Sequence, residues 1–188
     1  MMERYLDELW ETLQAVSIRA GGAELGLGEG MRALLSLFLN KRQEGRLVSF
    51  IGNGGSAAIA GHMTADFFKN GRMRTIGLFD APALTCFGND YGYEHVFSKQ
   101  IERVMGRGDL LVAISSSGRS PNIVNAIEAA HGNGATVLSL TGFSPDNPSR
   151  GMADASLWVP SDRYGIVESI HGVLLQAIVD AMKEQDEA

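Results

Sequence analysis

Residues 108–130 read GDLLVAISSSGRSPNIVNAIEAA, and this stretch decides the fold. Its segment 109–114 (DLLVAI) is apolar from Leu110 onwards, which is typical of a buried parallel strand, because such a strand is covered on both faces. A serine-rich loop follows, and Pro121 then stands at the start of a helix, where its missing N–H costs nothing. Strand, polar loop and helix in this order form the repeating unit of an α/β fold, whose ligands bind at the carboxyl ends of the strands.

The same unit recurs on both sides of this stretch. The predicted strands lie at 47–51, 75–79, 109–114, 135–140 and 156–159. The predicted helices lie at 57–69, around 83, and at 94–105, 121–131 and 164–183, while 142–151 is the most loop-like stretch. Recurring right-handed crossovers predict a five-stranded parallel sheet in a three-layer αβα sandwich, a flavodoxin-like or Rossmann-like arrangement.

Two helices are expected ahead of the first strand. Apolar residues fall at three-and-four spacing over residues 1–20, and Gly21 and Gly22 end that pattern. A second apolar helix follows at 31–42. Because no linker or low-complexity tract interrupts the chain, we expect one domain over 1–188 with a helical extension of about 1–43.

The composition excludes several classes of protein. The chain has 188 residues, a net charge of −6 and 16 Lys and Arg residues, which argues against a non-specific binder of nucleic acid. The single cysteine, Cys86, excludes an intramolecular disulfide and a cysteine-rich zinc site. The acidic start of the chain is unlike a signal peptide, and no apolar run reaches the roughly 18 residues that span a membrane. We therefore expect a cytoplasmic protein with neither a membrane partner nor a direct nucleic-acid partner.

Four serines, Ser115, Ser116, Ser117 and Ser120, lie between the strand at 109–114 and the helix that follows. Hydroxyl and backbone N–H groups converge at such a helix N-terminus, where the helix dipole favours an anion. A phosphate ester needs this arrangement. The alternative is a set of turn and N-cap serines, but a single capping serine would satisfy that interpretation.

A second polar loop, Asn53, Gly54, Gly55 and Ser56, follows the first strand. Its glycines let a ligand approach the backbone closely, and Ser56 adds a hydroxyl. The loop lacks the Gly-x-x-x-x-Gly-Lys-Ser/Thr pattern and the Gly-x-Gly-x-x-Gly pattern with a later carboxylate. We therefore expect a substrate site here and no nucleotide cofactor.

Polar residues at helical spacing supply candidates for chemistry. His62 and Asp66 are four residues apart and share one helix face, as a metal-binding or proton-transfer pair would. A surface ion pair is the alternative. Glu168, Gly172 and Gln176 follow one face of the apolar last helix, where they either line a site or pair across a subunit interface.

The segment GNDYGYE at 88–94 is polar and contains two glycines. Asp90 in this segment either begins the helix that includes Glu94 or contacts sugar hydroxyls opposite the serine loop. We include Asp90 among the candidate substrate-binding residues.

Taken together, these segments resemble the SIS (sugar isomerase) domain and, within it, the sedoheptulose 7-phosphate isomerase (phosphoheptose isomerase) family. The matching segments are GNGGSAAIAGH at 52–62, FGNDYGYEHVFSKQIE at 87–102, GDLLVAISSSGRSPNIVNAIEAA at 108–130, LSLTG at 138–142 and WVPS at 158–161. The glycine and serine loops are general to SIS domains, whereas GNDYGYE is more specific to the heptose isomerase branch.

The resemblance implies a homotetramer with active sites at subunit interfaces. It implies that Ser56 and the four serines of the second loop bind the phosphate of a sugar. The expected reaction converts sedoheptulose 7-phosphate to D-glycero-D-manno-heptose 7-phosphate, which feeds heptose synthesis for envelope glycans. Some members hold zinc at the positions of His62, Asp66, Glu168 and Gln176, so this set is the candidate site for one Zn²⁺ per subunit.

The departures from the family fall at the chemistry. Family members usually carry Glu at the position of Asp66, Gln at that of Glu168 and His at that of Gln176. We expect Asp66 or Glu168 to be the base that removes a proton next to the carbonyl, with His62 as a metal ligand or second proton carrier. The alternative is a non-catalytic SIS protein that binds a phosphosugar as a regulator, or one that associates with the replication initiator protein, as a relative in this branch does.

Overall fold

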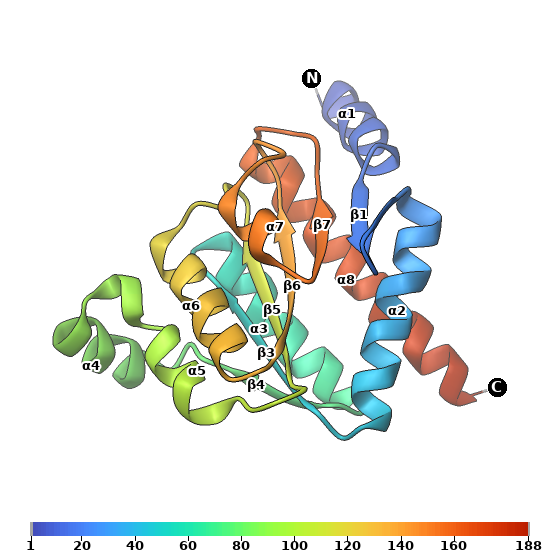
Figure 1. The fold of residues 1–188 in the computed structure, drawn as a ribbon. Helices are drawn as coiled ribbons and strands as arrows, with labels where there is room; N and C mark the ends of the chain where they lie inside the picture. The colour runs from blue at the N-terminus through green and yellow to red at the C-terminus, as the bar shows by residue number, and fades with distance from the viewer. Residues whose placement is uncertain (1, 188) are drawn as a thin grey trace.

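The computed structural model describes residues 2–187, and its centre is a seven-stranded mixed sheet (Figure 1). The strands are β1 (Ser17–Ala20), β2 (Ala23–Leu25), β3 (Leu47–Gly52), β4 (Arg74–Gly77), β5 (Leu110–Ser115), β6 (Thr136–Thr141) and β7 (Ala155–Trp158). Their order is β2-β1-β7-β6-β5-β3-β4. The five strands from β7 to β4 are parallel, as the sequence predicts, while β1 is antiparallel to both β2 and β7.

Helices cover both faces of the sheet, which confirms the three-layer αβα arrangement (Figure 1). They are α1 (Met2–Gln14), α2 (Leu27–Gln43), α3 (Gly55–Lys69), α4 (Ala81–Tyr91), the 3₁₀ turn η1 (Tyr93–His95), α5 (Ser98–Val104), α6 (Pro121–Gly132), α7 (Pro148–Met152) and α8 (Tyr164–Glu187). Leu110, Val112 and Ile114 of β5 pack with α2, α3 and α8, whereas Leu111 and Ala113 pack with α5 and α6. Successive strand residues point to opposite faces, so a strand covered on both sides is apolar throughout.

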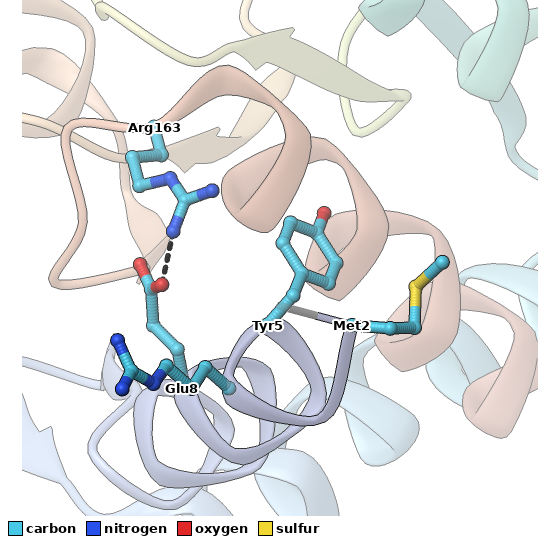
Figure 2. A pocket seen from close by; sticks show the side chains of 5 residues that line it. Met2, Tyr5, Glu8 and Arg163 are labelled. Atoms are coloured by element: carbon cyan, nitrogen blue, oxygen red, sulfur yellow. Dashed lines mark hydrogen bonds and ion pairs between the residues drawn. The ribbon is translucent and has the colours of Figure 1, made fainter.

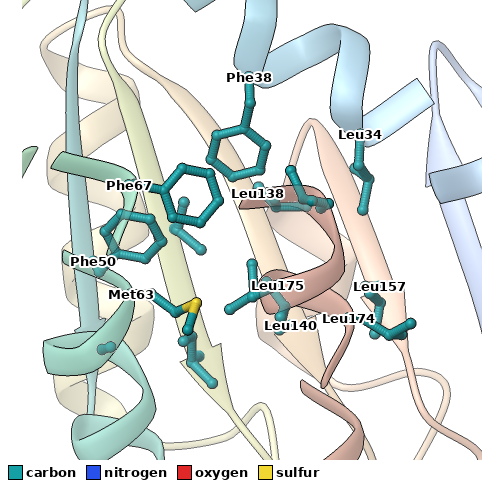
Figure 3. Close-up of a cluster of buried hydrophobic side chains, with 14 of the residues drawn as sticks. Leu34, Phe38, Phe50, Met63, Phe67, Leu138, Leu140, Leu157, Leu174 and Leu175 are labelled. Atoms are coloured by element: carbon teal, nitrogen blue, oxygen red, sulfur yellow. The ribbon is translucent and has the colours of Figure 1, made fainter. Parts of the chain in front are cut away.

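Aromatic side chains join α2, α3 and β3 in the larger of the two cores (Figure 3). The ring centroid of Phe67 lies 4.5 Å from that of Phe38 and 5.2 Å from that of Phe50. Leu174 and Leu175 extend this core into α8. Full burial of each such side chain contributes about 1.5–3 kcal/mol. The core thereby holds α3 and α8, the two helices that carry the candidate acidic residues, against the sheet.

The sheet has two more strands than the sequence predicts, because residues 17–25 form a hairpin instead of ending the first helix. Ile18 on β1 is fully buried, and its strand pairs with β7. Gly21 and Gly22 take positive φ angles of 58° and 81°, which a two-residue hairpin turn of this kind requires. Apolar spacing typical of a helix continues up to Val16, so periodicity alone does not mark where α1 ends.

α4 is longer than the short helix predicted around residue 83. The Asp80 carboxylate caps its start by accepting a hydrogen bond from the Ala83 amide at 3.3 Å, and Gly92, with a φ of 86°, ends it. Asp90 therefore lies in the last turn of α4. The interpretation that Asp90 begins the next helix is wrong.

Two other stretches differ from their predicted form. The helix predicted at 94–105 is divided into η1 and α5. The loop predicted at 142–151 contains α7, which begins where the Asn147 side chain accepts a hydrogen bond from Arg150 N at 2.9 Å. The remaining predicted elements agree with the structure to within a few residues at each end.

α8 is the longest helix, and it is apolar enough to cross a membrane by length and composition. Half of that apolar stretch is buried inside the protein's own fold. Core helices of soluble proteins pass the same test, so this property is weak evidence for a membrane span. Burial of that half against the sheet accounts for part of the apolar composition.

Candidate active site

The two polar loops meet where the order of the strands changes direction. After β3 the chain moves to β4 on one side, whereas after β5 it moves to β6 on the other. Parallel sheets bind ligands in the crevice at such a switch point. A polar cavity of about 140 Å³ lies there. Its lining residues are Asn53, Ser56, Ile114, Ser115, Ser116, Ser117, Ser120, Tyr164 and Glu168.

Several hydroxyls of the serine loop are free for a ligand. Ser116 is buried, and its Oγ has no hydrogen-bond partner within residues 2–187. Ser120 is the N-cap of α6, yet its side chain makes no capping hydrogen bond. Ser117 Oγ accepts a hydrogen bond of 3.3 Å from the Arg119 amide. The capping interpretation therefore does not account for this loop, and a buried unpaired hydroxyl beside a polar cavity favours a ligand.

The stretch predicted as a loop at 142–151 holds the serine loop in place. Gly142 N donates to the Ser116 carbonyl at 2.8 Å. The amide and the hydroxyl of Ser149 both donate to the Gly118 carbonyl, at 3.0 and 2.9 Å. We call these contacts of Gly142 and Ser149 the brace of the serine loop. The sequence carries a signal for α7, which contains Ser149, because Asn147 followed by Pro148 is typical of a helix start.

The glycine loop lies against a carboxylate from α8, that of Glu168, which lines the same cavity. A Cβ atom on Gly55 would lie 2.3 Å from Glu168 Oε2, so only glycine permits this approach. The neighbouring Gly54 has a φ of 54°, in the region that favours glycine. Asn53 and Ser56 from the loop line the cavity itself. The structure thus unites Glu168, predicted as a possible base, with both polar loops.

Asp66 and His62 form a pair on α3 but do not line the cavity. His62 Nε2 lies 3.6 Å from Asp66 Oδ2, and the His62 side chain is 63% exposed against 20% for Asp66. They follow Gly55 by two to three turns of α3, or roughly 10–16 Å along the helix axis. In one chain, this arrangement matches the surface ion pair that the sequence left as an alternative.

Gln176 and Asp90 also lie outside the cavity. The Gln176 amide donates to Asp180 Oδ1 at 3.0 Å along α8. Asp90 contacts the Asn89 amide and Cys86 on α4, a helix that projects from the body of the molecule (Figure 1). A single chain therefore does not bring either residue to the serine loop.

The four residues predicted to hold zinc are not assembled within one chain. Among residues 2–187, no three His, Cys, Asp or Glu side chains are grouped as a metal ion requires. His62 and Asp66 remain a pair, while Glu168 lies against Gly55. These residues as placed do not fit a four-ligand zinc site, and we derive no catalytic step through a metal.

His171 lies one turn after Glu168 on α8 and is fully buried. Burial lowers the pKa of His171 to about 4, because the imidazolium would lose its hydration, and the contact with the Thr141 carbonyl opposes this shift in part. Nε2 lies 3.1 Å from that carbonyl oxygen, while Nδ1 has no partner among the described residues. His171 is therefore neutral at pH 7 and links α8 to the end of β6.

Tyr164 and Ile114 line the cavity without having been predicted to do so. Tyr164 is the first residue of α8, and its ring packs edge-on against that of Phe143 at 4.9 Å between centroids. Its position just after β7 is the usable signal, because that loop leaves the carboxyl edge of the sheet as the two polar loops do.

A second, wider cavity of about 810 Å³ lies between α1 and the start of α8 (Figure 2). Its lining residues are Met2, Arg4, Tyr5, Glu8 and Arg163. Arg163 forms an ion pair with Glu8, and its guanidinium lies 5.3 Å from the centre of the Tyr5 ring. Because the smaller cavity has the polar lining and lies at the switch point of the sheet, we assign the active site to it.

The chain is similar in sequence to a known family of proteins. The family model "SIS domain" matches residues 23–142. The phosphoheptose isomerase of Bradyrhizobium sp. (strain BTAi1) is 39% identical over 147 residues, which are 75% of this chain and 74% of the relative. That of Neisseria meningitidis serogroup C is 43% identical over 140 residues, covering 70% and 71% of the two chains.

Solved structures show the same relationship. The phosphoheptose isomerase GmhA from Neisseria gonorrhoeae superposes with a TM-score of 0.84 at 33% identity, covering 97% of each chain. The Vibrio vulnificus NanR protein, solved with ManNAc-6P, is 18% identical with a TM-score of 0.68, over 96% of this chain and 60% of NanR, and shares the fold alone. The chain belongs to the SIS domain family and, within it, to the phosphoheptose isomerases.

Proposed function

We propose that this protein is an aldose–ketose isomerase that converts sedoheptulose 7-phosphate to D-glycero-D-manno-heptose 7-phosphate. The observation that carries the proposal is the placement of the Glu168 carboxylate in one cavity with the serine loop. A cavity that combines several neutral hydroxyl donors with one carboxylate suits a substrate that carries both a phosphate and an acidic C–H bond. The names of the relatives support the same substrate class.

In this proposal the serine loop holds the phosphate. Ser115, Ser116, Ser117 and Ser120 supply hydroxyls, and the N-terminus of α6 supplies its dipole. Ser56 adds a fifth hydroxyl from the start of α3. Binding the phosphate at one end leaves the carbonyl end of the sugar to extend away from the serine loop.

The proposed reaction is a proton transfer through an enediol. Glu168 removes a proton from C1 of the ketose, and the electrons of the broken C–H bond form the C1–C2 double bond while the C2 oxygen takes up a proton. Return of a proton to C2, with loss of the O1 proton, gives the aldehyde at C1. Atoms and electrons balance without an oxidant, because C1 is oxidised as C2 is reduced.

Asp66 is the other carboxylate proposed as the base, and His62 is proposed as a second proton carrier. Both lie on α3 outside the cavity of a single chain. We propose a homotetramer in which active sites lie at subunit interfaces, so that these side chains face a site that a second chain completes. The apolar, exposed side chains of α1 support association: Met2, Leu6 and Trp10 are all exposed.

The test is exchange of substrate hydrogen with solvent. Purified protein is incubated with sedoheptulose 7-phosphate in deuterated water, with and without added zinc, and deuterium in the sugar is followed by NMR. Wild type should incorporate deuterium, Glu168→Ala should abolish incorporation, and both should bind the sugar phosphate. Loss in Asp66→Asn with full activity in Glu168→Ala would move the base to Asp66.

The binding-protein alternative has its own outcome in the same experiment. If wild type binds the phosphosugar but exchanges no hydrogen with any heptose, hexose or pentose phosphate, with or without divalent metal, the isomerase proposal fails. A phosphosugar-binding regulator would then replace it. Asp66→Glu is the matched variant, because it restores the family's usual side chain and should preserve or raise turnover.

A further inference from the structure

The side chain of Asn53, in the glycine loop, forms hydrogen bonds with residues outside both polar loops. Its side-chain amide faces that of Asn122, the second residue of α6. Asn53 Nδ2 donates to Asn122 Oδ1 at 2.9 Å, and Asn122 Nδ2 donates back to Asn53 Oδ1, also at 2.9 Å. Asn122 is buried, being 3% exposed, whereas Asn53 lines the cavity.

A third residue reaches the same oxygen. The Tyr93 hydroxyl donates to Asn53 Oδ1 at 3.0 Å, although the Tyr93 residue is 61% exposed. Tyr93 belongs to η1, and the next residue, Glu94, has its backbone carbonyl bound by the Asn125 amide of α6 at 2.9 Å. Two asparagines one turn apart on α6 thus hold η1 and the glycine loop together.

These contacts determine what Asn53 has left to offer a ligand. An amide oxygen accepts two hydrogen bonds, and both positions on Asn53 Oδ1 are taken, by Asn122 and Tyr93. The amide nitrogen has two hydrogens, of which one is used by Asn122. Asn53 is therefore left with one N–H group, so it donates to a ligand and does not accept.

The pair also spans the switch point of the sheet. The parallel ladder between β3 and β5 ends at Gly52 and Ile114. Beyond it, the segment after β3 enters α3 on one face of the sheet, and the segment after β5 enters α6 on the other. The Asn53–Asn122 pair joins these two segments just past the end of the ladder.

We propose that Asn122 and Tyr93 are positioning residues that fix Asn53 as a hydrogen-bond donor to the sugar phosphate and hold the glycine loop at a set distance from the serine loop. The proposal deepens the proposed function, on which its choice of ligand rests. An amide pair that only stabilised the fold would not need to contain a residue that lines the cavity. It would also not need a hydrogen bond from the hydroxyl of an exposed residue, Tyr93.

The test compares ligand affinity in variants of the pair with affinity in a matched control. Asn122→Leu keeps the volume of the side chain and removes both of its hydrogen bonds to Asn53. Asn133→Leu is the control, because this asparagine at the end of α6 also donates two hydrogen bonds, to the carbonyls of Ile101 and Met105, away from the cavity. Tyr93→Phe removes only a hydroxyl at an exposed position, so folding is not at risk.

The dissociation constant for sedoheptulose 7-phosphate is measured by calorimetry, and KM and kcat by turnover. Asn122→Leu should raise the dissociation constant and KM about tenfold and Tyr93→Phe about threefold, the effect of losing one or two hydrogen bonds, with kcat reduced less than about threefold. Asn133→Leu should lower stability and leave the dissociation constant within about twofold of wild type. In an Asn53→Ala background, Asn122→Leu and Tyr93→Phe should have no further effect, because both act through Asn53.

Equal affinities in Asn122→Leu and Asn133→Leu would overturn the proposal, as would undiminished effects of both substitutions in the Asn53→Ala background. The binding measurement separates this inference from the proposed function. If wild type binds the sugar phosphate but does not turn it over, the isomerase proposal fails and the positioning proposal is still decided by the affinities. If wild type binds no sugar phosphate, both are overturned.

Discussion

Ser116 is the serine of the loop whose hydroxyl is buried without a hydrogen-bond partner among residues 2–187. Its Oγ is buried and has no partner within the described chain, so removing it breaks no hydrogen bond of the free protein. Ser116→Ala should weaken binding of the phosphosugar by about 1–3 kcal/mol, through the loss of a hydrogen bond to a charged group. The free energy of unfolding should stay the same or rise, because a buried polar group without a partner is costly. Titration calorimetry and urea unfolding measure the two quantities.

Ser139→Ala is the matched control for this prediction. Ser139 on β6 is also buried with an unpartnered hydroxyl among residues 2–187, but it does not line the cavity. Its substitution should leave the affinity unchanged. Equal losses of affinity in the two variants would contradict a phosphate site at the serine loop.

His171 makes the stability of the protein depend on pH in a defined direction. Burial lowers the pKa of His171 to about 4, against roughly 6.5 for an exposed imidazole, so the unfolded chain binds this proton more tightly than the folded one. The free energy of unfolding that depends on neutral His171 is fully present above pH 6.5. It falls as the pH drops from 6.5 towards 4, by a total of about 3 kcal/mol. His171→Gln cannot be protonated and can still donate to the Thr141 carbonyl. Urea unfolding at pH 7 and pH 4 should show wild type losing more free energy than this variant, and parallel losses would contradict the prediction.

The sequence predicts which loops and which kinds of side chain form the candidate site. It does not predict which of the candidate side chains lie close together. The serine loop, Asn53, Ser56 and Glu168 do line one cavity, because loops after adjacent parallel strands must share an edge of the sheet. Asp66 shares a helix with the glycine loop, yet lies two to three turns away from it. Helical spacing shows which residues share a face, whereas the distance to another element depends on packing that the sequence does not display.

At the scale of elements, the brace formed by α7 on the serine loop predicts a sensitive glycine. Gly118 has a φ of 62°, and a Cβ there would lie 1.9 Å from Oδ1 of Asn147, the residue that caps α7. Gly118→Ala should cost about 2 kcal/mol of stability or more, because it combines an unfavourable backbone angle with displacement of that cap. It should also lower affinity for the phosphosugar, since the serine loop would move.

Gly132→Ala is the control at the other end of α6. A Cβ at Gly132 meets no atom within 4 Å, and its φ is outside the positive range that disfavours side chains. This variant should keep the affinity and the stability of wild type to within about 1 kcal/mol. Denaturant unfolding together with calorimetry distinguishes the two substitutions, and tolerance of Gly118→Ala would contradict the brace.

The elements that the sequence predicts correctly are those with a long or unambiguous pattern. Apolar runs such as 110–114 identify the five parallel strands, and Pro121 marks the start of α6. The β1–β2 hairpin was missed because its strands have four and three residues, too few to show an alternation, and because they directly follow a helix with continuing apolar spacing. Its strands are stabilised by tertiary contacts instead: Arg150 pairs with Glu24 and stacks over Trp158 at 5.1 Å from the ring centre.

At the scale of the whole molecule, α8 connects the core, the site and the outer surface. Ile170, Leu174 and Ile178 are buried in the larger core, and Glu168 reaches the cavity from the same helix. Val173 on the same helix is 54% exposed. A helix that is apolar on nearly all sides is expected to be buried, and much of the apolar surface of α8 is covered by the chain's own sheet.

The remaining apolar surface predicts association of subunits. None of the residues of α1 is buried, and Leu6 and Trp10 are 56% and 63% exposed. An amphipathic helix that leaves apolar side chains such as these two in water is stabilised when a second copy covers them. Wild type should therefore sediment as an oligomer, which we expect to be a tetramer, and the double variant Leu6→Glu, Trp10→Glu should dissociate. Val104→Glu, at an exposed apolar position on α5, is the control and should keep the oligomer.

Dissociation should also abolish turnover, and this consequence tests the placement of the catalytic groups. His62 and Asp66 lie on α3 outside the cavity of their own chain, so they can take part in the reaction only if another chain completes a site around them. The serine loop, by contrast, is held entirely within one chain by Gly142 and Ser149. The dissociated variant should then still bind the phosphosugar while losing hydrogen exchange. A monomer that exchanges hydrogen at the wild-type rate would show that Glu168 and the single-chain cavity suffice, and would remove both the shared site and any catalytic part for His62 and Asp66.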